Sequence, residues 1–159
     1  MLKYIELNND KTPKNKGKLD KEVYKSFDNL ENAGVLLDDN VLLIDFDEDK
    51  IINYIDTTYP TLKVITTKGV HFYYSLPKNL KLKKKSMIDT INVGGFQVDY
   101  KTSSKQYAVV KLNGKTRETN GPLSFENLAE LPPLLYPLTK REDNLSGMAE
   151  HERKKWHTF

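Results

Sequence analysis

Two aspartates, Asp45 and Asp47, stand two residues apart at the end of the aliphatic run Leu42-Leu43-Ile44. Side chains alternate across a β-strand, so both carboxylates point to the same face, where their negative charges repel each other. A hard divalent ion such as Mg²⁺ or Mn²⁺ neutralises such a pair, because these ions prefer carboxylate oxygens. Asp45 and Asp47 are therefore candidate metal ligands. The alternative is a strand that simply runs into an acidic surface turn.

A histidine opens a later apolar run, in the segment Lys68-Gly69-Val70-His71. His71 alternates with apolar neighbours, so it faces away from the apolar side of the predicted strand. Gly69 has no side chain and allows a ligand or another backbone to come close. An imidazole beside a glycine and a lysine can contact a phosphate, and the alternative is a partly exposed strand histidine.

A third carboxylate lies in the alternating segment that ends in Val98-Asp99-Tyr100-Lys101. The polar side of this predicted strand presents one carboxylate, Asp99, and one cation, Lys101. A third acid on a neighbouring strand would complete a metal site. An ordinary half-exposed strand is the alternative.

Hydrophobic periodicity and turn residues predict the elements that position these groups. We predict strands at 4–7, 33–37, 41–46, 62–66, 70–75, 91–100 and 107–112, and helices at 21–31, 51–59 and 125–130. The runs 33–37 and 41–46 are expected to form one hairpin, and the runs 62–66 and 70–75 a second. The predicted fold class is α+β, with a mixed or antiparallel sheet and flanking helices.

The chain has 159 residues, which favours one domain over two. We assign that domain to residues 1–140, and we expect residues 141–159 to begin a C-terminal helical segment or linker that is cut short. Cysteine is absent, which excludes disulfides, thiolate zinc sites and iron–sulfur clusters. No apolar run approaches the ~20 residues of a membrane span, so no membrane partner is expected, and a reducing cytoplasm is compatible with the composition.

Charge is segregated along the chain, although the net charge is only +3. Residues 38–49 hold six acids and no base, and residues 78–85 hold five lysines and no acid. Such a protein can hold cations at one place and phosphates at another, and two solvated loops of opposite sign are the alternative. Candidate nucleic-acid contacts are Lys14, Lys16, Lys81, Lys83, Lys84, Lys85 and the aromatic Tyr73. Tyr74, Phe96 and Tyr100 are assigned to the core instead.

Taken in order, the three groups resemble the motifs of the archaeo-eukaryotic primase superfamily. The likeness is to its prim-pol branch, the bifunctional primase–polymerase domains of phages, plasmids and other mobile elements. Asp45 and Asp47 match its hydrophobic-Asp-hydrophobic-Asp motif, Gly69-Val70-His71 its small-x-His motif, and Val98-Asp99 its hydrophobic-Asp motif. The resemblance covers about residues 10–112. The family's proline near the end of the following strand is missing from Tyr107–Lys111.

This resemblance implies a primase–polymerase architecture with an RRM-like catalytic core. It implies that Asp45, Asp47 and Asp99 are catalytic and hold Mg²⁺ or Mn²⁺, and that His71 contacts the phosphates of the incoming nucleotide. Lys68, Gly69 and Lys101 would complete the nucleotide site. The implied partners are a single-stranded DNA template and primer, an NTP or dNTP, and a helicase domain or protein, in the cytoplasm of a bacterial or archaeal host.

The function predicted on this basis is nucleotidyl transfer by a DNA primase and/or DNA polymerase. A non-catalytic DNA-binding replication-initiation module linked to a helicase is the alternative. A metal-dependent nuclease that nicks an origin would need paired histidines and a tyrosine nucleophile. His151 and His157 lie in the terminal tail, far along the chain from the aspartates, which argues against that third class.

Overall fold

The computed structural model describes residues 1–82 and 86–138, which form two antiparallel sheets and one α-helix. The four-stranded sheet has the order β1-β2-β8-β9, with β1 Tyr4–Glu6, β2 Ala33–Leu36, β8 Tyr107–Leu112 and β9 Lys115–Thr116. The five-stranded sheet has the order β4-β5-β3-β7-β6, with β3 Val41–Phe46, β4 Leu62–Ile65, β5 Val70–Ser75, β6 Ser86–Ile91 and β7 Gln97–Thr102. The helical segments are α1 Asp49–Thr58 and the 3₁₀ turns η1 Leu19–Lys21 and η2 Pro133–Leu135.

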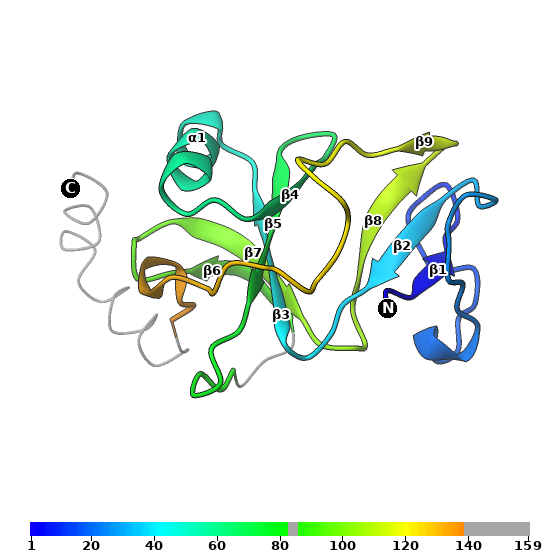
Figure 1. The fold of residues 1–159 in the computed structure, drawn as a ribbon, viewed down its shortest axis with the longest axis horizontal. Helices are drawn as coiled ribbons and strands as arrows, with labels where there is room; N and C mark the ends of the chain where they lie inside the picture. The colour runs from blue at the N-terminus through cyan, green and yellow to red at the C-terminus, as the bar shows by residue number, and fades with distance from the viewer. Residues whose placement is uncertain (83–85, 139–159) are drawn as a thin grey trace.

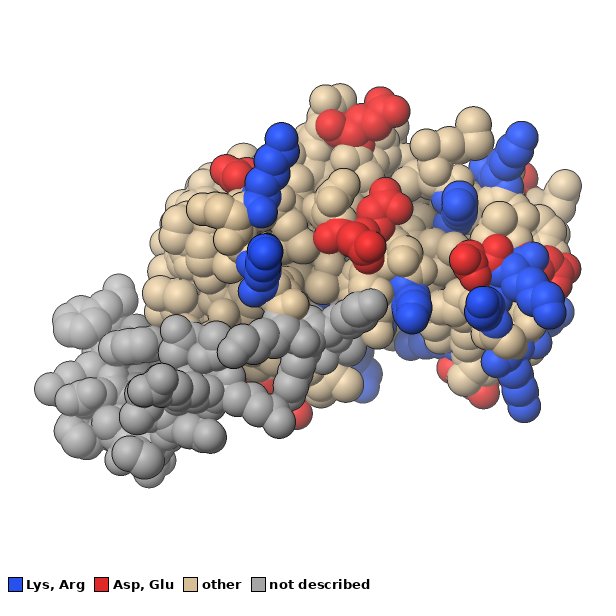
Figure 2. All heavy atoms as spheres, turned by 90° about the horizontal axis from the view of Figure 1, so that it is seen from below, with Lys and Arg blue, Asp and Glu red and all other residues tan. Residues whose placement is uncertain are grey.

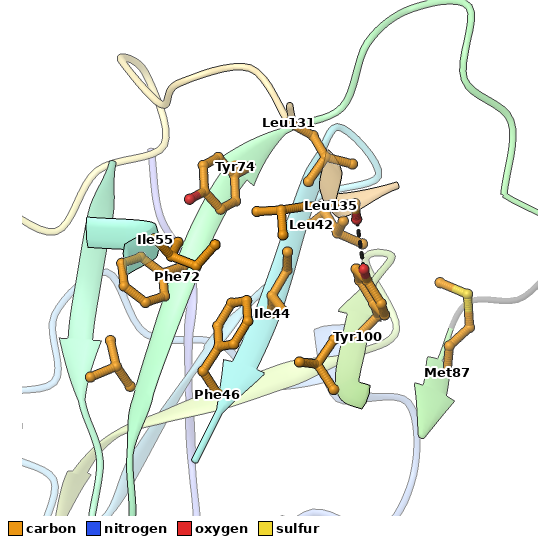
Figure 3. Close-up of a cluster of buried hydrophobic side chains, with 12 residues drawn as sticks. Leu42, Ile44, Phe46, Ile55, Phe72, Tyr74, Met87, Tyr100, Leu131 and Leu135 are labelled. Carbon is orange, nitrogen blue, oxygen red and sulfur yellow. Dashed lines mark hydrogen bonds between the residues drawn. The ribbon is translucent and has the colours of Figure 1, made fainter. Parts of the chain in front are cut away.

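The five-stranded sheet is the central layer, with α1 on one side of it and the four-stranded sheet on the other (Figure 1). Its first face packs against Ile55 of α1 and against Leu131 and Leu135 of the C-terminal part of the described chain. Figure 3 shows this cluster, in which Leu42, Ile44 and other aliphatic side chains interlock with aromatic rings. Strand β3 therefore contributes every second side chain to a continuous apolar core.

The opposite face of the central sheet packs against the four-stranded sheet. Leu43 of β3 and Tyr73 of β5 are fully buried there among residues of β2 and β8, including Val35 and Val110. This inter-sheet core does not extend to the end of β3, where Asp45 follows Leu43 on the same face. The sheet therefore has one wholly apolar face and one face that changes from apolar to ionisable along its strands.

The predicted α+β class with flanking helices is wrong in its finer part, because the protein is mainly β with a single short α-helix in the described chain. The predicted helix 21–31 is absent, since the backbone of Tyr24 exchanges two hydrogen bonds with that of Tyr4. The predicted helix 125–130 is absent too. There the backbones of Ala129 and Leu131 bond to Ser75 at the end of β5. In both segments backbone pairing with a strand outweighs a helical spacing of apolar residues.

The predicted hairpin of 33–37 and 41–46 is also wrong. Both strands exist, but β2 pairs with β1 and β8, whereas β3 pairs with β5 and β7. The intervening turn carries the chain from one sheet to the other. The predicted strand 91–100 is wrong in its bounds, because β7 begins only at Gln97 and follows a turn in which Gly95 has a φ of 84°. Strand β6, which pairs with β7, lies almost entirely before this range and was not predicted.

Two local predictions are confirmed. The helix predicted at 51–59 is α1, and the second hairpin is formed by β4 and β5. Asn113 and Gly114, with φ values of 51° and 78°, form the two-residue turn between β8 and β9. No helix of residues 1–82 and 86–138 is long and apolar enough to cross a membrane. The predicted C-terminal segment 141–159 lies outside the described residues.

Candidate active-site cleft

Asp45 is the centre of the candidate site, because the register of the central sheet places two of the predicted residues directly opposite it. His71 of β5 is its partner on one side and Asp99 of β7 its partner on the other. Residues opposite one another in antiparallel strands point to the same face of the sheet. His71 Nε2 lies 3.7 Å from Asp45 Oδ2. Groups at positions 45, 71 and 99 thus form one row across three neighbouring strands.

Asp47 follows the end of β3 and is exposed, one alternation beyond Asp45. Partial burial raises the pKa of the Asp47 carboxyl, and the negative charges of Asp45 and Asp99 raise it further. The positive charge of Lys68 and the charge of His71 act in the opposite direction and lower this pKa. These five side chains therefore share one electrostatic environment, in which the acids repel one another.

Gly69 fixes the spacing between the histidine strand and the aspartate strand. A Cβ atom at this position would stand only 2.0 Å from the backbone oxygen of Phe46 and 3.0 Å from Cα of Asp47. The Thr66 hydroxyl accepts a hydrogen bond of 3.0 Å from the Gly69 N–H and closes the turn. The small residue of this motif is therefore required by the close approach of the β3 backbone, the structural role that a strand glycine can serve.

A cleft of about 380 Å³ opens over Asp45, Asp47 and His71. One part of its wall comes from the central sheet and its β4–β5 turn, and includes Lys68 and Lys101. The rest of the wall comes from the N-terminal segment, β8 and the segment after β9, and consists of Lys11, Tyr107, Val109 and Arg117. Four permanent cations and two carboxylates line the cleft. Such a lining suits an anionic ligand that carries a metal ion.

Sequence reasoning missed the second part of this wall. Arg117 is half-buried, its Nη1 donates to the Val109 carbonyl oxygen at 3.4 Å, and burial lowers its pKa while Tyr73 and Asp45 act to raise it. A signal was available, because Arg117 is the first of only three arginines in a chain that has 22 lysines. Arginine presents a planar fork of donors that matches phosphate and carboxylate groups, which lysine does not.

Asp99 differs from the other two aspartates, because it does not line the cleft. Its Oδ1 accepts a hydrogen bond of 2.8 Å from the backbone N–H of Asp89. Asp89 lies in an irregularity of β6 and has a φ of 53°, a conformation that few residues other than glycine adopt. The bulge therefore holds one oxygen of Asp99.

The three predicted ligands do not close around a single point. Within residues 1–82 and 86–138, no group of three or more His, Cys, Asp or Glu side chains is arranged to hold a metal ion. Two polar atoms of the row are nevertheless buried without a hydrogen-bond partner, Oδ1 of Asp45 and Nδ1 of His71. Buried polar atoms are rarely left unpaired in folded proteins. Neither atom therefore has its hydrogen-bonding capacity met by the described residues.

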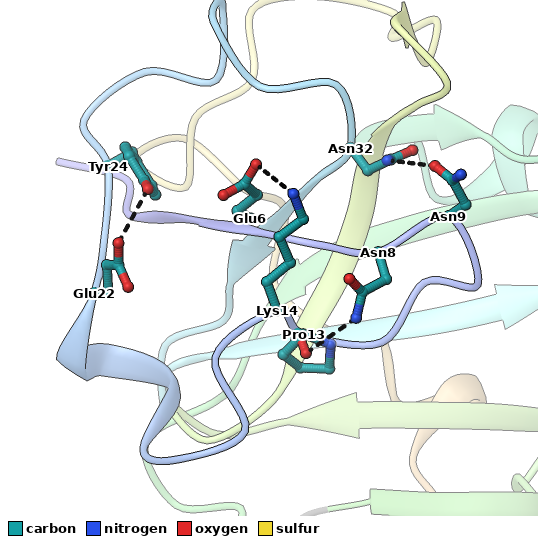
Figure 4. A network of polar contacts seen from close by, with 8 residues as sticks. All are labelled: Glu6, Asn8, Asn9, Pro13, Lys14, Glu22, Tyr24 and Asn32. Carbon is teal, nitrogen blue, oxygen red and sulfur yellow. Dashed lines mark hydrogen bonds and ion pairs between the residues drawn. The ribbon is translucent and has the colours of Figure 1, made fainter.

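The predicted nucleic-acid contacts are dispersed. Lys14 forms an ion pair of 3.1 Å with Glu6 (Figure 4), and Lys16 and Lys81 are exposed away from the cleft. Figure 2 shows that Lys and Arg gather over the end of the molecule that holds β1. The remaining predicted contacts Lys83, Lys84 and Lys85 lie outside the described residues.

The prediction that Tyr73 is the exposed aromatic is wrong, because its side chain is fully buried between the sheets and stacks on Phe125. Tyr73 lies beside Leu43, on the face of the sheet that carries Asp45. At that depth, however, the face is covered by the second sheet. Tyr74 and Tyr100 are buried as predicted, and Phe96 is partly buried.

Comparison with known proteins adds no assignment, since neither a protein-family model nor a curated protein matches the chain.

Proposed function

We propose that this domain is a DNA primase and/or DNA polymerase, which carries out template-dependent nucleotidyl transfer in the replication of a mobile element. The observation that carries the proposal is the position of Asp45 directly opposite both His71 and Asp99. The three motifs that resemble the prim-pol family are 26 and 28 residues apart at these positions, counted from 45 to 71 and from 71 to 99. Their meeting in one row beside a cationic cleft supports a common chemical task.

The carboxylates fit Mg²⁺ or Mn²⁺ as part of a ligand set that the nucleotide completes. Mg²⁺ is usually bound through one or two protein carboxylates together with substrate phosphates, rather than by a closed protein cage. Asp45 and Asp47 line the cleft, Asp45 has an unpaired buried oxygen, and Asp99 is adjacent. When bound, such ions neutralise phosphate charge and lower the pKa of the attacking 3′-hydroxyl.

The protein's own contribution is to hold the triphosphate and to stabilise charge. Lys68, Lys101 and Arg117 line the same cleft as the aspartates, and so does His71. Fixed cations and N–H donors that face a phosphoryl group stabilise the charge that develops on its oxygens during transfer. A single cleft that places carboxylates beside these donors accommodates both the metal ions and the phosphates.

A non-catalytic DNA-binding module is the second candidate. The open arrangement of the acids in the described residues, and the hydrogen bond that occupies Oδ1 of Asp99, favour it. This reading predicts DNA binding that falls steeply with salt concentration and that is independent of divalent ions.

The experiment that separates these functions is nucleotide incorporation by the full chain. Wild type is given primed single-stranded DNA with dNTPs, or unprimed template with NTPs, in Mg²⁺ and in Mn²⁺. Asp45→Asn is expected to lower the rate about a hundredfold or more, the loss typical when a charge-stabilising group is removed from an active site. Asp38→Asn is the matched control, because Asp38 is exposed and lies outside the cleft.

Equal incorporation by wild type and Asp45→Asn would contradict the proposal. If wild type incorporates nothing with either ion and still binds DNA, the domain is the non-catalytic module.

A further inference from the structure

Lys11 reaches the cleft from a part of the chain that is remote from all three motifs. It lies in the loop 8–13, directly after β1, and lines the cleft together with Asp45 and His71. Its φ is 73°, in the left-handed region that non-glycine residues adopt at an energetic cost. A lysine with a long flexible side chain has no intrinsic preference for this conformation, so the surrounding contacts must impose it.

Those contacts are two backbone hydrogen bonds within the loop and one hydrogen bond from the side chain of Tyr107. The Lys11 N–H donates to the carbonyl oxygen of Asn8 at 3.0 Å, and the Asn8 N–H donates to that of Thr12 at 2.7 Å. The hydroxyl of Tyr107, at the start of β8, donates to the carbonyl oxygen of Lys11 at 2.8 Å. Tyr107 itself lines the cleft, and its ring lies 5.9 Å from Nζ of Lys101. The loop is therefore fastened to the wall of the cleft by Tyr107.

Lys14, directly after this loop, differs from Lys11 because it already has a partner. It forms an ion pair of 3.1 Å with Glu6 (Figure 4). Lys11 has no ion pair within 4.0 Å among the described residues. The nearest acid in sequence, Asp10, accepts hydrogen bonds from the N–H and the hydroxyl of Thr12. The charge of Lys11 is thus left free for a ligand in the cleft.

We propose that Lys11 is a phosphate ligand, which binds the phosphate chain of a nucleoside triphosphate across the cleft from His71 and Lys68. The inference rests on the proposed function. A compact ammonium group is a strong point charge for phosphate oxygens. Lys11 belongs to the N-terminal segment, whereas His71 and Lys68 belong to the β4–β5 hairpin. Cations from these two separate segments can therefore hold one phosphate chain from two directions.

The test is calorimetric binding of dATP with Mg²⁺ to the full chain, compared for wild type, Lys11→Asn and Lys14→Asn. Asparagine removes the charge but accepts a positive φ more readily than most residues, so the loop conformation is retained. Lys11→Asn is expected to weaken dATP binding about tenfold, the loss typical of one hydrogen bond to a charged group. Lys14→Asn is expected to stay within about twofold of wild type, because exposed ion pairs contribute little.

A second variant tests the hydrogen bond that fastens the loop, with the charge of Lys11 left in place. Tyr107→Phe removes the hydrogen bond to the Lys11 carbonyl and retains the ring, so it is expected to weaken dATP binding about threefold, less than the loss of the charge itself. Thermal unfolding of each variant checks that the fold is intact.

The outcomes separate this inference from the proposed function. Unchanged dATP affinity in Lys11→Asn overturns the inference, even where Asp45→Asn abolishes incorporation. Weaker binding of a single-stranded oligonucleotide with unchanged dATP binding also overturns it, since Lys11 would then serve backbone phosphates. Weaker dATP binding supports it, even where wild type incorporates no nucleotide and the polymerase function fails. A wild type that does not bind dATP overturns both.

Discussion

The two faces of the central sheet are built by the same strands but serve different purposes. On the helix-covered face, Leu42, Ile44 and Phe46 of β3 are all buried in one apolar cluster. On the other face, Leu43 is buried in the inter-sheet core, whereas Asp45 lies at the cleft. The first face is apolar along the whole of β3. The second face changes from a buried aliphatic side chain to a carboxylate between Leu43 and Asp45.

This difference shows how strands position the row formed by Asp45, His71 and Asp99. Because side chains alternate across a strand, the buried residues on one face hold the backbone from which the charged residues on the other face project. Asp45 is flanked in sequence by Ile44 and Phe46, both of which are buried almost completely. A row of charges on rigid strands is more precisely placed than the same residues on loops.

The largest expected effect comes from neighbouring residues on opposite faces of β3. Ile44→Ala is expected to lower the free energy of unfolding by about 2–5 kcal/mol, because it leaves a cavity in a fully packed core. Asp45→Asn is expected to change that free energy by less than about 1 kcal/mol, because a part-exposed polar group is replaced by one of similar shape. Urea denaturation monitored by circular dichroism measures both.

The comparison also predicts opposite effects on activity. Asp45→Asn is expected to lower the rate of incorporation about a hundredfold or more with the fold intact. Ile44→Ala is expected to retain activity at temperatures where it remains folded. A loss of stability in Asp45→Asn as large as that in Ile44→Ala would mean that the charged row is part of the structural core.

Local patterns of the sequence predict strands β3, β4 and β5 of the central sheet well. The alternation around Asp45, His71 and Asp99 assigns each of them to the face that the structure gives it. The turn residues Lys68 and Gly69 predict the β4–β5 hairpin correctly. These features depend on residues close together in the chain, where periodicity and turn chemistry decide the conformation.

Pairing between distant segments could not be predicted in the same way. The runs that form β2 and β3 are both aliphatic and buried, so the sequence gives no sign that they belong to different sheets. The depth of Tyr73 depends on β2 and β8 of the other sheet, and the positions of Lys11 and Arg117 depend on packing after β1 and β9. The site was therefore predictable as a row of motif residues but not as a cleft with two walls.

A smaller effect is expected from two tyrosines on opposite faces of the central sheet. The Tyr100 hydroxyl donates to the carbonyl oxygen of Leu135 at 2.6 Å in the helix-side core, as Figure 3 shows. The Tyr73 hydroxyl is buried on the other face with no hydrogen-bond partner in the described residues. Tyr100→Phe is expected to destabilise the fold by about 1–1.5 kcal/mol, and Tyr73→Phe to be neutral or slightly stabilising.

Urea midpoints of the two variants test this pair. A similar loss for Tyr73→Phe and Tyr100→Phe would indicate that the Tyr73 hydroxyl has a partner, such as a buried water molecule that bridges it to Arg117. The buried tyrosine hydroxyls of the helix-side core and of the inter-sheet core would then both be hydrogen-bonded.

The smallest effect concerns Asp47, whose carboxyl pKa is raised by partial burial and by the charges of Asp45 and Asp99. The native protein therefore binds this proton more tightly than the unfolded chain, so stability falls as the pH rises from the ordinary carboxyl pKa, about 3.9, to the raised native value. Above that window the whole penalty is present, and below it the penalty is absent. Asp47→Asn is expected to raise Tm by about 1–2 °C at pH 7 and to leave it unchanged at pH 3, because screening of an exposed carboxylate keeps the effect small.

Divalent ions sharpen this last prediction. If the acids at the cleft hold Mg²⁺, the bound ion offsets their mutual repulsion. Mg²⁺ at a concentration on the order of 10 mM then raises the free energy of unfolding of wild type, because the ion binds the native state alone. The gain in Tm is expected to be smaller in Asp47→Asn than in wild type or in Asp38→Asn, as measured by thermal unfolding with and without the ion. A lower Tm for Asp47→Asn at pH 7 would show that Asp47 stabilises the charged end of β3. An equal rise at pH 3 would show that the gain in stability does not come from removal of the carboxylate charge.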